Sequence, residues 1–149
     1  MSRIGRFAAY AAAFEKSVAS NDWSVVEPYF TEDAVYEILI GPPLGGRFEG
    51  RAAVLAYFED VLDRFDRRFE SRELALLEGP KEVGDSVWIR GSATYRAKGV
   101  SEFVLELEET VTFSGDRICR LEDRYEPAMA EAIAAYLKAH GGKLGIHVD

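Results

Sequence analysis

The second half of the sequence contains strand-like segments separated by short glycine-containing turns, and this pattern constrains the fold more than any other feature. The segments are rich in β-branched and aromatic side chains and span about residues 69–77, 87–97, 102–113 and 117–125. The turns between them contain Gly84-Asp85, Lys98-Gly99 and Gly115-Asp116. Tight hairpins favour glycine at such positions, so the pattern predicts an antiparallel sheet built from consecutive hairpins.

Other parts of the chain carry apolar side chains at helical spacing. The expected helices span about residues 4–19, 51–65 and 128–140, and the last should end at Gly141-Gly142. A short helix is expected over residues 22–30, with Asn21 as its N-cap and Pro28 limiting its length. A first strand over residues 34–40 and an irregular loop over 41–46 complete the prediction.

These elements predict an α+β fold in which helices pack on the concave face of a cone-shaped, curved antiparallel sheet and enclose a pocket. A chain of 149 residues is long enough for one sizeable core, and no linker or internal repeat divides it. We expect one domain over residues 1–149, with a core at about 4–126 and a C-terminal helix at about 128–140.

Composition excludes several classes of protein. The net charge of −8 opposes binding to nucleic acid, and no basic run offsets it. A single cysteine, Cys119, allows no internal disulfide, which suits a reducing cytoplasm, and no Cys/His spacing indicates a metal site. The Ala-rich start is short and interrupted by Glu15-Lys16, so we expect a structural helix rather than a signal peptide, and no segment is apolar enough for a membrane.

Four short motifs, in this order, resemble the nuclear transport factor 2-like superfamily, and within it the SnoaL-like and ketosteroid-isomerase-like branch. They are Asp22-Trp23, residues 29–36, Phe48-Glu49-Gly50-Arg51 with Val54 and Tyr57-Phe58, and Gly115-Asp116-Arg117-Ile118. The resemblance covers the chain to about Tyr125. It implies the fold described above and a homodimer through the outer sheet face, but it implies no single activity, because that fold hosts isomerases, cyclases, hydrolases, dehydratases and binding domains.

Hairpin register predicts which side chains line the pocket. If Lys98-Gly99 and Gly115-Asp116 are two-residue turns, Glu106 lies opposite Gly91, and Glu108 lies opposite both Ile89 and Asp123. The inner face would then carry Glu106, Glu108, Asp123, Tyr95 and Tyr125 among apolar residues. The outer face would be half-apolar and Arg-rich, with Trp88, Arg90, Phe103, Leu105, Leu107, Arg120 and Arg124 among its members.

The carboxyl groups are the predicted catalytic residues. Two facing acids in apolar surroundings cannot both ionise cheaply, so one pKa should rise into the range of general acid/base catalysis. We predict that Asp123 moves a proton and that Glu108 raises its pKa or shares that proton. Glu106, Tyr95 or Tyr125 should hydrogen-bond a substrate oxygen. A one-residue bulge would instead turn Glu106 and Glu108 outward and bring Glu109 inward, and Asp123 could simply neutralise an arginine.

The resemblance supports Asp123, which falls where SnoaL-like cyclases carry a catalytic Asp, and Glu106, which falls near the oxyanion-hole acid of ketosteroid isomerases. Phe14 and Ile38 stand where those isomerases have their Tyr and their base, so that chemistry does not transfer whole. The residues expected to contact substrate are Tyr95, Tyr125, Tyr10, Phe14, Trp23, Tyr36, Ile38, Phe58 and Leu121.

The sequence therefore predicts a cofactor-independent isomerase, cyclase or hydrolase acting on a small apolar molecule. Two other interpretations remain open at this point. One is a non-catalytic domain that binds a hydrophobic ligand and keeps Asp123 ionised and salt-bridged, and the other is a domain whose outer sheet face docks a protein.

Overall fold

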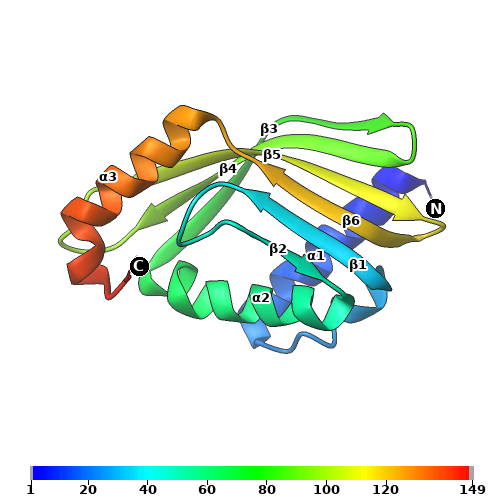
Figure 1. Cartoon of the computed structure of the whole chain (residues 1–149), viewed down its shortest axis with the longest axis horizontal. Coiled ribbons are helices and arrows are strands. Elements are labelled where there is room, and N and C mark those ends of the chain that lie inside the picture. Colours follow the sequence, from blue (N-terminus) through cyan, green and yellow to red (C-terminus); the bar gives the residue numbers. More distant parts are fainter. Residues whose placement is uncertain (1, 148–149) are drawn as a thin grey trace.

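The computed structural model describes residues 2–147, and within that range the chain folds as one six-stranded sheet with helices on its concave side (Figure 1). The helices are α1 (Arg3–Ser20), α2 (Arg51–Arg64) and α3 (Pro127–Leu144), with short 3-10 turns η1 (Glu27–Tyr29) and η2 (Asp66–Arg68). The strands are β1 (Phe30–Leu39), β2 (Gly46–Glu49), β3 (Ser71–Val83), β4 (Ser86–Arg96), β5 (Phe103–Ser114) and β6 (Arg117–Arg124). The predicted α+β fold class is confirmed.

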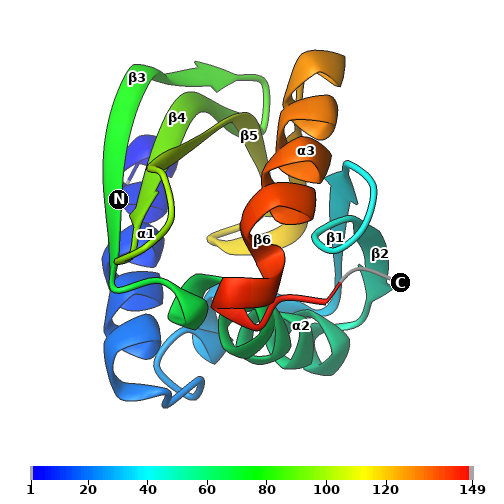
Figure 2. The same cartoon turned by 90° about the vertical axis from the view of Figure 1, so that its left-hand side faces the viewer.

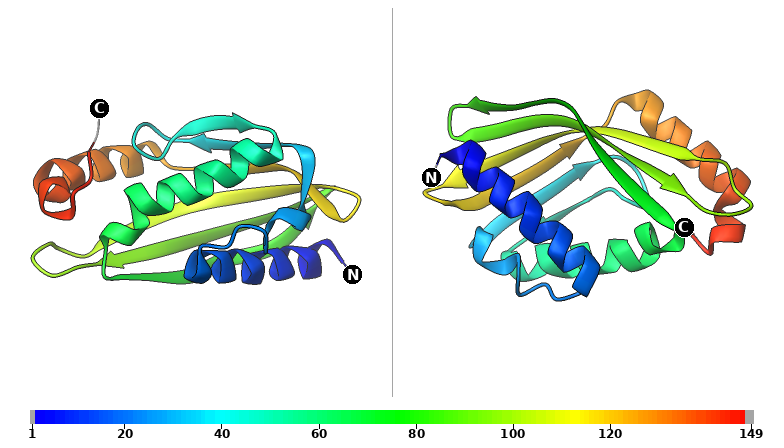
Figure 3. Two further views of the ribbon diagram at one scale, coloured as in Figure 1. Left: turned by 90° about the horizontal axis from the view of Figure 1, so that it is seen from below. Right: turned by 180° about the vertical axis from the view of Figure 1, so that it is seen from behind.

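The strand order is β2-β1-β6-β5-β4-β3, so β3 to β6 form the predicted series of hairpins. One pair departs from the prediction of an antiparallel sheet, because β1 and β6 run parallel. Strand β6 is the last in the chain and pairs with β1, the first. No hairpin turn joins these two strands, so nothing forces them to be antiparallel. The sheet curves around α1 and α2, and α3 lies across one end of it (Figures 2 and 3).

Helix α1 follows its predicted amphipathic pattern and begins at a side-chain cap. The Ser2 hydroxyl accepts a hydrogen bond from the Gly5 amide at 3.0 Å, and Phe7 and Tyr10 are buried against the sheet. Asn21 ends this helix in the left-handed conformation, with φ of 60°. The prediction that Asn21 starts a helix over 22–30 was wrong, because only the three residues of η1 become helical there.

Helix α3 is longer than predicted. Helix α3 continues through Gly141 and Gly142 to Leu144, and both Leu144 and Ile146 are buried. The Ile146 oxygen approaches so closely that a Cβ on Gly141 would lie 3.1 Å from it. Glycine at 141 thus allows the chain to turn back and pack, instead of ending the helix. Strand β2 was also missed, since Gly46 was placed in a loop.

The pair Ser114–Arg117 beside the Gly115-Asp116 turn is as predicted, but further along β5 both hairpin registers differ from the prediction by one residue. The pairing of β4 with β5 ends at Tyr95 and Phe103, so residues 96–102 form a longer turn than Lys98-Gly99 alone. In β6, Cys119 is an extra residue between the pairs Phe113–Ile118 and Thr112–Arg120. This bulge shifts the register so that Glu109 faces Asp123. Every side chain of β5 is consequently on the opposite face from the one predicted.

None of the helices within residues 2–147 has the length and apolar character needed to cross a membrane.

Candidate active site

The concave face of the sheet and helices α1 and α2 enclose a cavity of about 560 Å³. Its wall is mostly apolar. Of the residues predicted to contact substrate, all but Trp23 line it: Tyr95, Tyr125, Tyr10, Phe14, Tyr36, Ile38, Phe58 and Leu121. Trp23 lies in the core behind the wall, where its ring packs against Phe14 and Phe58. A cavity of this size accommodates a small organic molecule.

Two carboxyl groups meet on the cavity wall at the centre of the sheet. Asp123 of β6 and Glu109 of β5 are directly opposite one another, and their side chains lie within hydrogen-bonding range. The Tyr36 hydroxyl, from β1, donates to Asp123 Oδ2. Asp123 Oδ1 is buried and has no donor among residues 2–147 if Glu109 is ionised, whereas a protonated Glu109 supplies one.

Burial and mutual repulsion hold one proton on this pair. Burial raises the pKa of Glu109 well above its usual range, and the adjacent Asp123 charge raises it further. Burial also raises the pKa of Asp123, but the hydrogen bonds from Glu109 and Tyr36 oppose that rise. Glu109 therefore holds a proton more tightly than Asp123 does, and the hydrogen bonds from Tyr36 and Glu109 favour the charged form of Asp123.

Phenol groups surround the pair. Burial raises the pKa of Tyr36, Tyr10 and Tyr125, and the Asp123 charge adds to each rise. Tyr57 behaves in the same way, although its hydroxyl already donates to the Leu44 carbonyl. These hydroxyls keep their protons at neutral pH, so they can donate hydrogen bonds to a substrate oxygen but cannot act as bases.

A second polar group lies on the same cavity wall and was missed from the sequence. Arg72 of β3 contacts Glu15 of α1 at 2.9 Å and Asp66 of η2 at 3.1 Å, while the Tyr95 hydroxyl donates to Asp66 at 3.0 Å. Burial raises the pKa of Asp66, and the charge of Arg72 and the hydrogen bond from Tyr95 oppose that rise. The cavity thus has two polar regions, each containing carboxyl and phenol groups.

Glu106 and Glu108 do not reach the cavity. They lie on the convex face of β5, paired in register with Ser92 and Arg90 of β4, and Glu108 accepts a hydrogen bond from the Trp88 indole at 3.1 Å. The physical reason is the register shift, which reverses every side chain of a strand. The prediction that these two acids line the pocket with Asp123 was wrong, and the alternative with Glu109 inward is the one observed.

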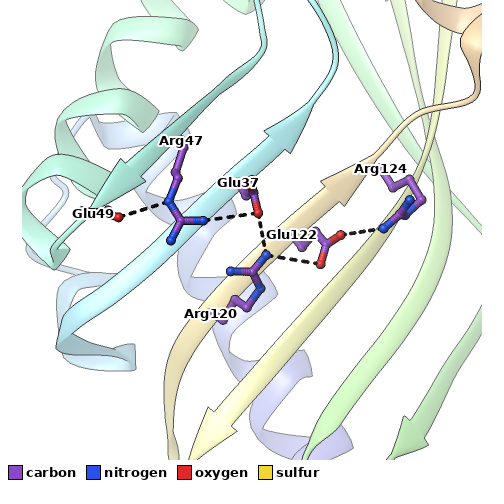
Figure 4. Close-up of polar contacts among 6 residues, drawn as sticks. All are labelled: Glu37, Arg47, Glu49, Arg120, Glu122 and Arg124. Carbon is purple, nitrogen blue, oxygen red and sulfur yellow. Dashed lines mark hydrogen bonds and ion pairs between the residues drawn. The ribbon is translucent and has the colours of Figure 1, made fainter.

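The same shift makes the convex face more polar than predicted. Phe103, Leu105 and Leu107 point toward the concave side. Val104, Glu106 and Glu108 point toward the convex side. Across β2, β1 and β6 this face carries six residues of alternating charge, each in contact with the next (Figure 4). We call this row of residues the charge ladder. They are Glu49, Arg47, Glu37, Arg120, Glu122 and Arg124, with contacts between 2.6 and 3.6 Å.

The residues from 2 to 147 contain no group of three or more His, Cys, Asp or Glu side chains placed to hold a metal ion. His140 lies near the end of α3, where its ring contacts the Ser101 hydroxyl at 3.0 Å and packs at a tilt of 53° against Tyr136.

The chain matches the SnoaL-like domain family over residues 8–123, a span that includes most of α1, the carboxyl pair and most of the cavity wall. It belongs to this family. No curated protein matches the chain.

Solved structures of the same architecture support the fold assignment. A Catenulispora acidiphila protein with a ketosteroid isomerase-like fold, in complex with trimethylamine, is 16% identical over 83% of this chain and 89% of its own, with a TM-score of 0.61. TerC, co-crystallised with polyporic acid, is 17% identical over 89% and 98%, with a TM-score of 0.66. An NTF2-like protein of unknown function from Burkholderia pseudomallei is 19% identical over 91% and 98%, with a TM-score of 0.65. At these identities the similarity establishes a shared fold.

Proposed function

We propose that this protein is an enzyme that catalyses proton transfer on a small, largely apolar molecule without a cofactor, as an isomerase, cyclase or hydrolase. The observation that carries the proposal is the Glu109–Asp123 pair, which shares a proton inside an apolar cavity. A carboxylate in such surroundings is a stronger base than one in water, because burial disfavours its charged form.

The geometry assigns a role to each group. Asp123 accepts a proton from a substrate carbon or from a water molecule, and its negative charge is neutralised in that step. The Tyr36 hydroxyl holds Asp123 in position. The hydroxyl of Tyr125 donates a hydrogen bond to the oxygen on which charge develops, while the proton of Glu109 is hydrogen-bonded to Asp123. Asp123 then returns its proton to the product.

The raised pKa of Asp123 favours this function over passive ligand storage. A binding domain gains nothing from a carboxyl group that burial destabilises, and it would be expected to pair Asp123 with an arginine. Within residues 2–147 no salt bridge reaches Asp123. The ligands named for the C. acidiphila protein and TerC add that this fold holds small organic molecules.

Hydrogen–deuterium exchange tests the proposal without knowledge of the natural substrate. The protein is incubated in D₂O with a panel of bicyclic and tricyclic ketones, beginning with 2-tetralone, and loss of the C–H signals next to the carbonyl is followed by NMR. We expect the wild type to accelerate exchange and Asp123→Asn to lower that acceleration by about 100-fold or more.

Glu108→Gln is the matched control, because it makes the same kind of change on the convex face of β5, and it should exchange as the wild type does. Acceleration retained in Asp123→Asn, or absent from the wild type over the whole panel, would contradict the proposal.

We also propose that the protein forms a homodimer through the convex sheet face. Val104 is 43% exposed on this face near one end of β5, and half-buried Trp88 lies on the same face further along β4; apolar side chains among polar ones are typical of subunit contacts. Sedimentation velocity should show a dimer that Val104→Lys dissociates. The control Ala132→Lys, on the exposed side of α3, should leave it intact; a wild-type monomer would rule the dimer out.

A further inference from the structure

The group formed by Glu15, Asp66, Arg72 and Tyr95 takes no part in the proton transfer described above, yet all four side chains line the cavity. Arg72 is the only cationic residue on the cavity wall that the structure of residues 2–147 defines. A charged side chain on the wall of an apolar cavity costs folding free energy unless its charge is compensated. Arg72 is therefore a candidate for binding a ligand.

Two carboxyl groups hold the Arg72 guanidinium in one orientation. Glu15 accepts from Nη1 at 2.9 Å, and Asp66 lies 3.1 Å from Nε. Burial alone would lower the pKa of Arg72, but the Glu15 hydrogen bond and the charges of Glu15 and Asp66 outweigh it and raise the pKa. The guanidinium therefore stays charged. Within residues 2–147 the buried Nε has no hydrogen-bond partner, although it lies 3.1 Å from Asp66, and Nη2 forms no hydrogen bond or ion pair, so N–H donors of Arg72 are available to a ligand.

Arg72 lies beside an opening of the cavity. It is followed on the same face of β3 by Leu74 and Leu76, which line the cavity although they are 51% and 57% exposed. Small residues of α1, Ala8 and Ala11, line the cavity as well. The cavity wall formed by β3 therefore reaches the solvent close to Arg72.

The charges around Arg72 define the kind of oxygen that it accepts. With Glu15 and Asp66 ionised, the three charged side chains sum to −1, and the Glu109–Asp123 pair adds a further negative charge when it holds one proton. A cavity that is negative overall disfavours an anionic ligand, because like charges repel strongly where water is excluded. A neutral carbonyl oxygen keeps the hydrogen bonds from Nη2 without that repulsion.

We propose that Arg72 binds the carbonyl oxygen of an uncharged, largely apolar substrate, and that Glu15 and Asp66 orient it for that purpose. The proposal rests on the proposed function, since it names the substrate class for the same cavity. It makes Arg72 a specificity-determining residue, at a different place on the wall from the Glu109–Asp123 pair.

Three probes of one size and shape test this inference by isothermal titration calorimetry. They are 2-acetylnaphthalene, which has a neutral carbonyl oxygen, 2-ethylnaphthalene, which has no acceptor, and 2-naphthoate, which is an anion. We expect the wild type to bind the ketone about 10-fold more tightly than the hydrocarbon, as a hydrogen bond to a charged donor provides, and more tightly than the anion.

The variants separate Arg72 from other hydrogen-bond donors. Arg72→Gln alone would leave Asp66 without its cation, so the informative variant combines Arg72→Gln with Asp66→Asn, and Arg90→Gln, at a partly exposed arginine of β4 outside the cavity wall, is the control. The double variant should bind ketone and hydrocarbon equally, whereas the control should keep the 10-fold preference. Circular dichroism of both variants shows whether the fold is retained.

Asp123→Asn distinguishes this inference from the proposed function. It should abolish the hydrogen–deuterium exchange while leaving the ketone preference intact. A preference that survives in the double variant, one that disappears in Asp123→Asn, or tightest binding of 2-naphthoate by the wild type would each overturn the assignment to Arg72.

Discussion

The two faces of the sheet treat acidic residues in opposite ways. On the convex face, Glu37 of β1 accepts a hydrogen bond from Arg120 at 2.6 Å, and that bond together with the charges of Arg120 and Arg47 holds the pKa of Glu37 below its usual value. On the concave face, Asp123 of β6 faces another acid and a phenol, and burial raises its pKa. Tyr36 and Glu37 are adjacent in the sequence, but the Tyr36 side chain lies on the concave face and the Glu37 side chain on the convex face.

The contrast shows where the chain gives up stability for function. The charge ladder lets each acid of the convex face keep its charge near arginines and water, which is the low-energy arrangement. The concave face instead buries two acids without a cation beside them, an arrangement that costs folding free energy. Such a cost is typical of sites where a perturbed carboxyl group is used.

The largest expected effect is on the pH dependence of stability. Since the pKa of Glu109 is raised in the folded state, the folded protein binds its proton more tightly than the unfolded chain does. Stability is therefore complete below the unfolded pKa, near about 4.3, and falls as the pH rises toward the folded pKa. Urea denaturation at a series of pH values from pH 5 to pH 9 should show the free energy of unfolding fall as the pH rises.

The second prediction removes one acid from the concave face. Glu109→Gln needs no proton to stay neutral, so it should raise the free energy of unfolding at pH 8 by about 1–3 kcal/mol and flatten the pH dependence. Glu108→Gln, on the convex face of the same strand, serves as the control. An equal gain in both variants would mean that the concave environment is not the cause.

A third prediction concerns the hydrogen bond from Tyr36 to Asp123. Because this bond favours the charged form of Asp123, Tyr36→Phe should raise the pKa of Asp123 and reduce stability by about 1 kcal/mol. The titration is measured by ¹³C NMR of the carboxyl carbons. Tyr57→Phe is the control, since its hydroxyl donates to a carbonyl and not to Asp123; a pKa that does not move in Tyr36→Phe would show that the bond has no electrostatic role.

The smallest effect is expected from the charge ladder. Arg120 joins Glu37 and Glu122, but all three side chains contact solvent, so Arg120→Gln should lower the unfolding midpoint by no more than about 2 °C. The difference from the wild type should shrink further in 0.5 M NaCl, because salt screens exposed charges. A large, salt-independent loss of stability would show that the ladder is more than a surface network.

Much of the fold was predictable because it depends on local pattern. The positions of α1 and α2 follow from apolar spacing, and the strands from β3 to β6 follow from alternation and turn residues. Errors occurred where tertiary packing replaces the local signal, as at residues 22–30, where the chain forms only η1, and at the C-terminus, where Leu144 and Ile146 pack against the core.

The candidate site was predicted in part, and one available signal was misjudged. Along β5 the apolar residues occupy every second position from Phe103 to Phe113, and Glu109 is the single acid in that series. Alternation by itself therefore placed Glu109 on the buried face, but the assumption of two-residue turns was given more weight. Asp123 was identified by resemblance and by its place near the end of the last strand.

The sequence by itself determined most of the helices, the hairpin strands β3 to β6, the family to which the chain belongs, and Asp123 as an acid on the cavity side of β6. Only the tertiary structure decided that Glu109 faces Asp123, because a bulge at Cys119 sets the register and no local pattern requires it. It also decided that Glu15, Asp66 and Arg72 meet, since α1, η2 and β3 bring them together across the fold. Contacts between distant segments depend on how whole elements pack, and this packing is a property of the complete chain.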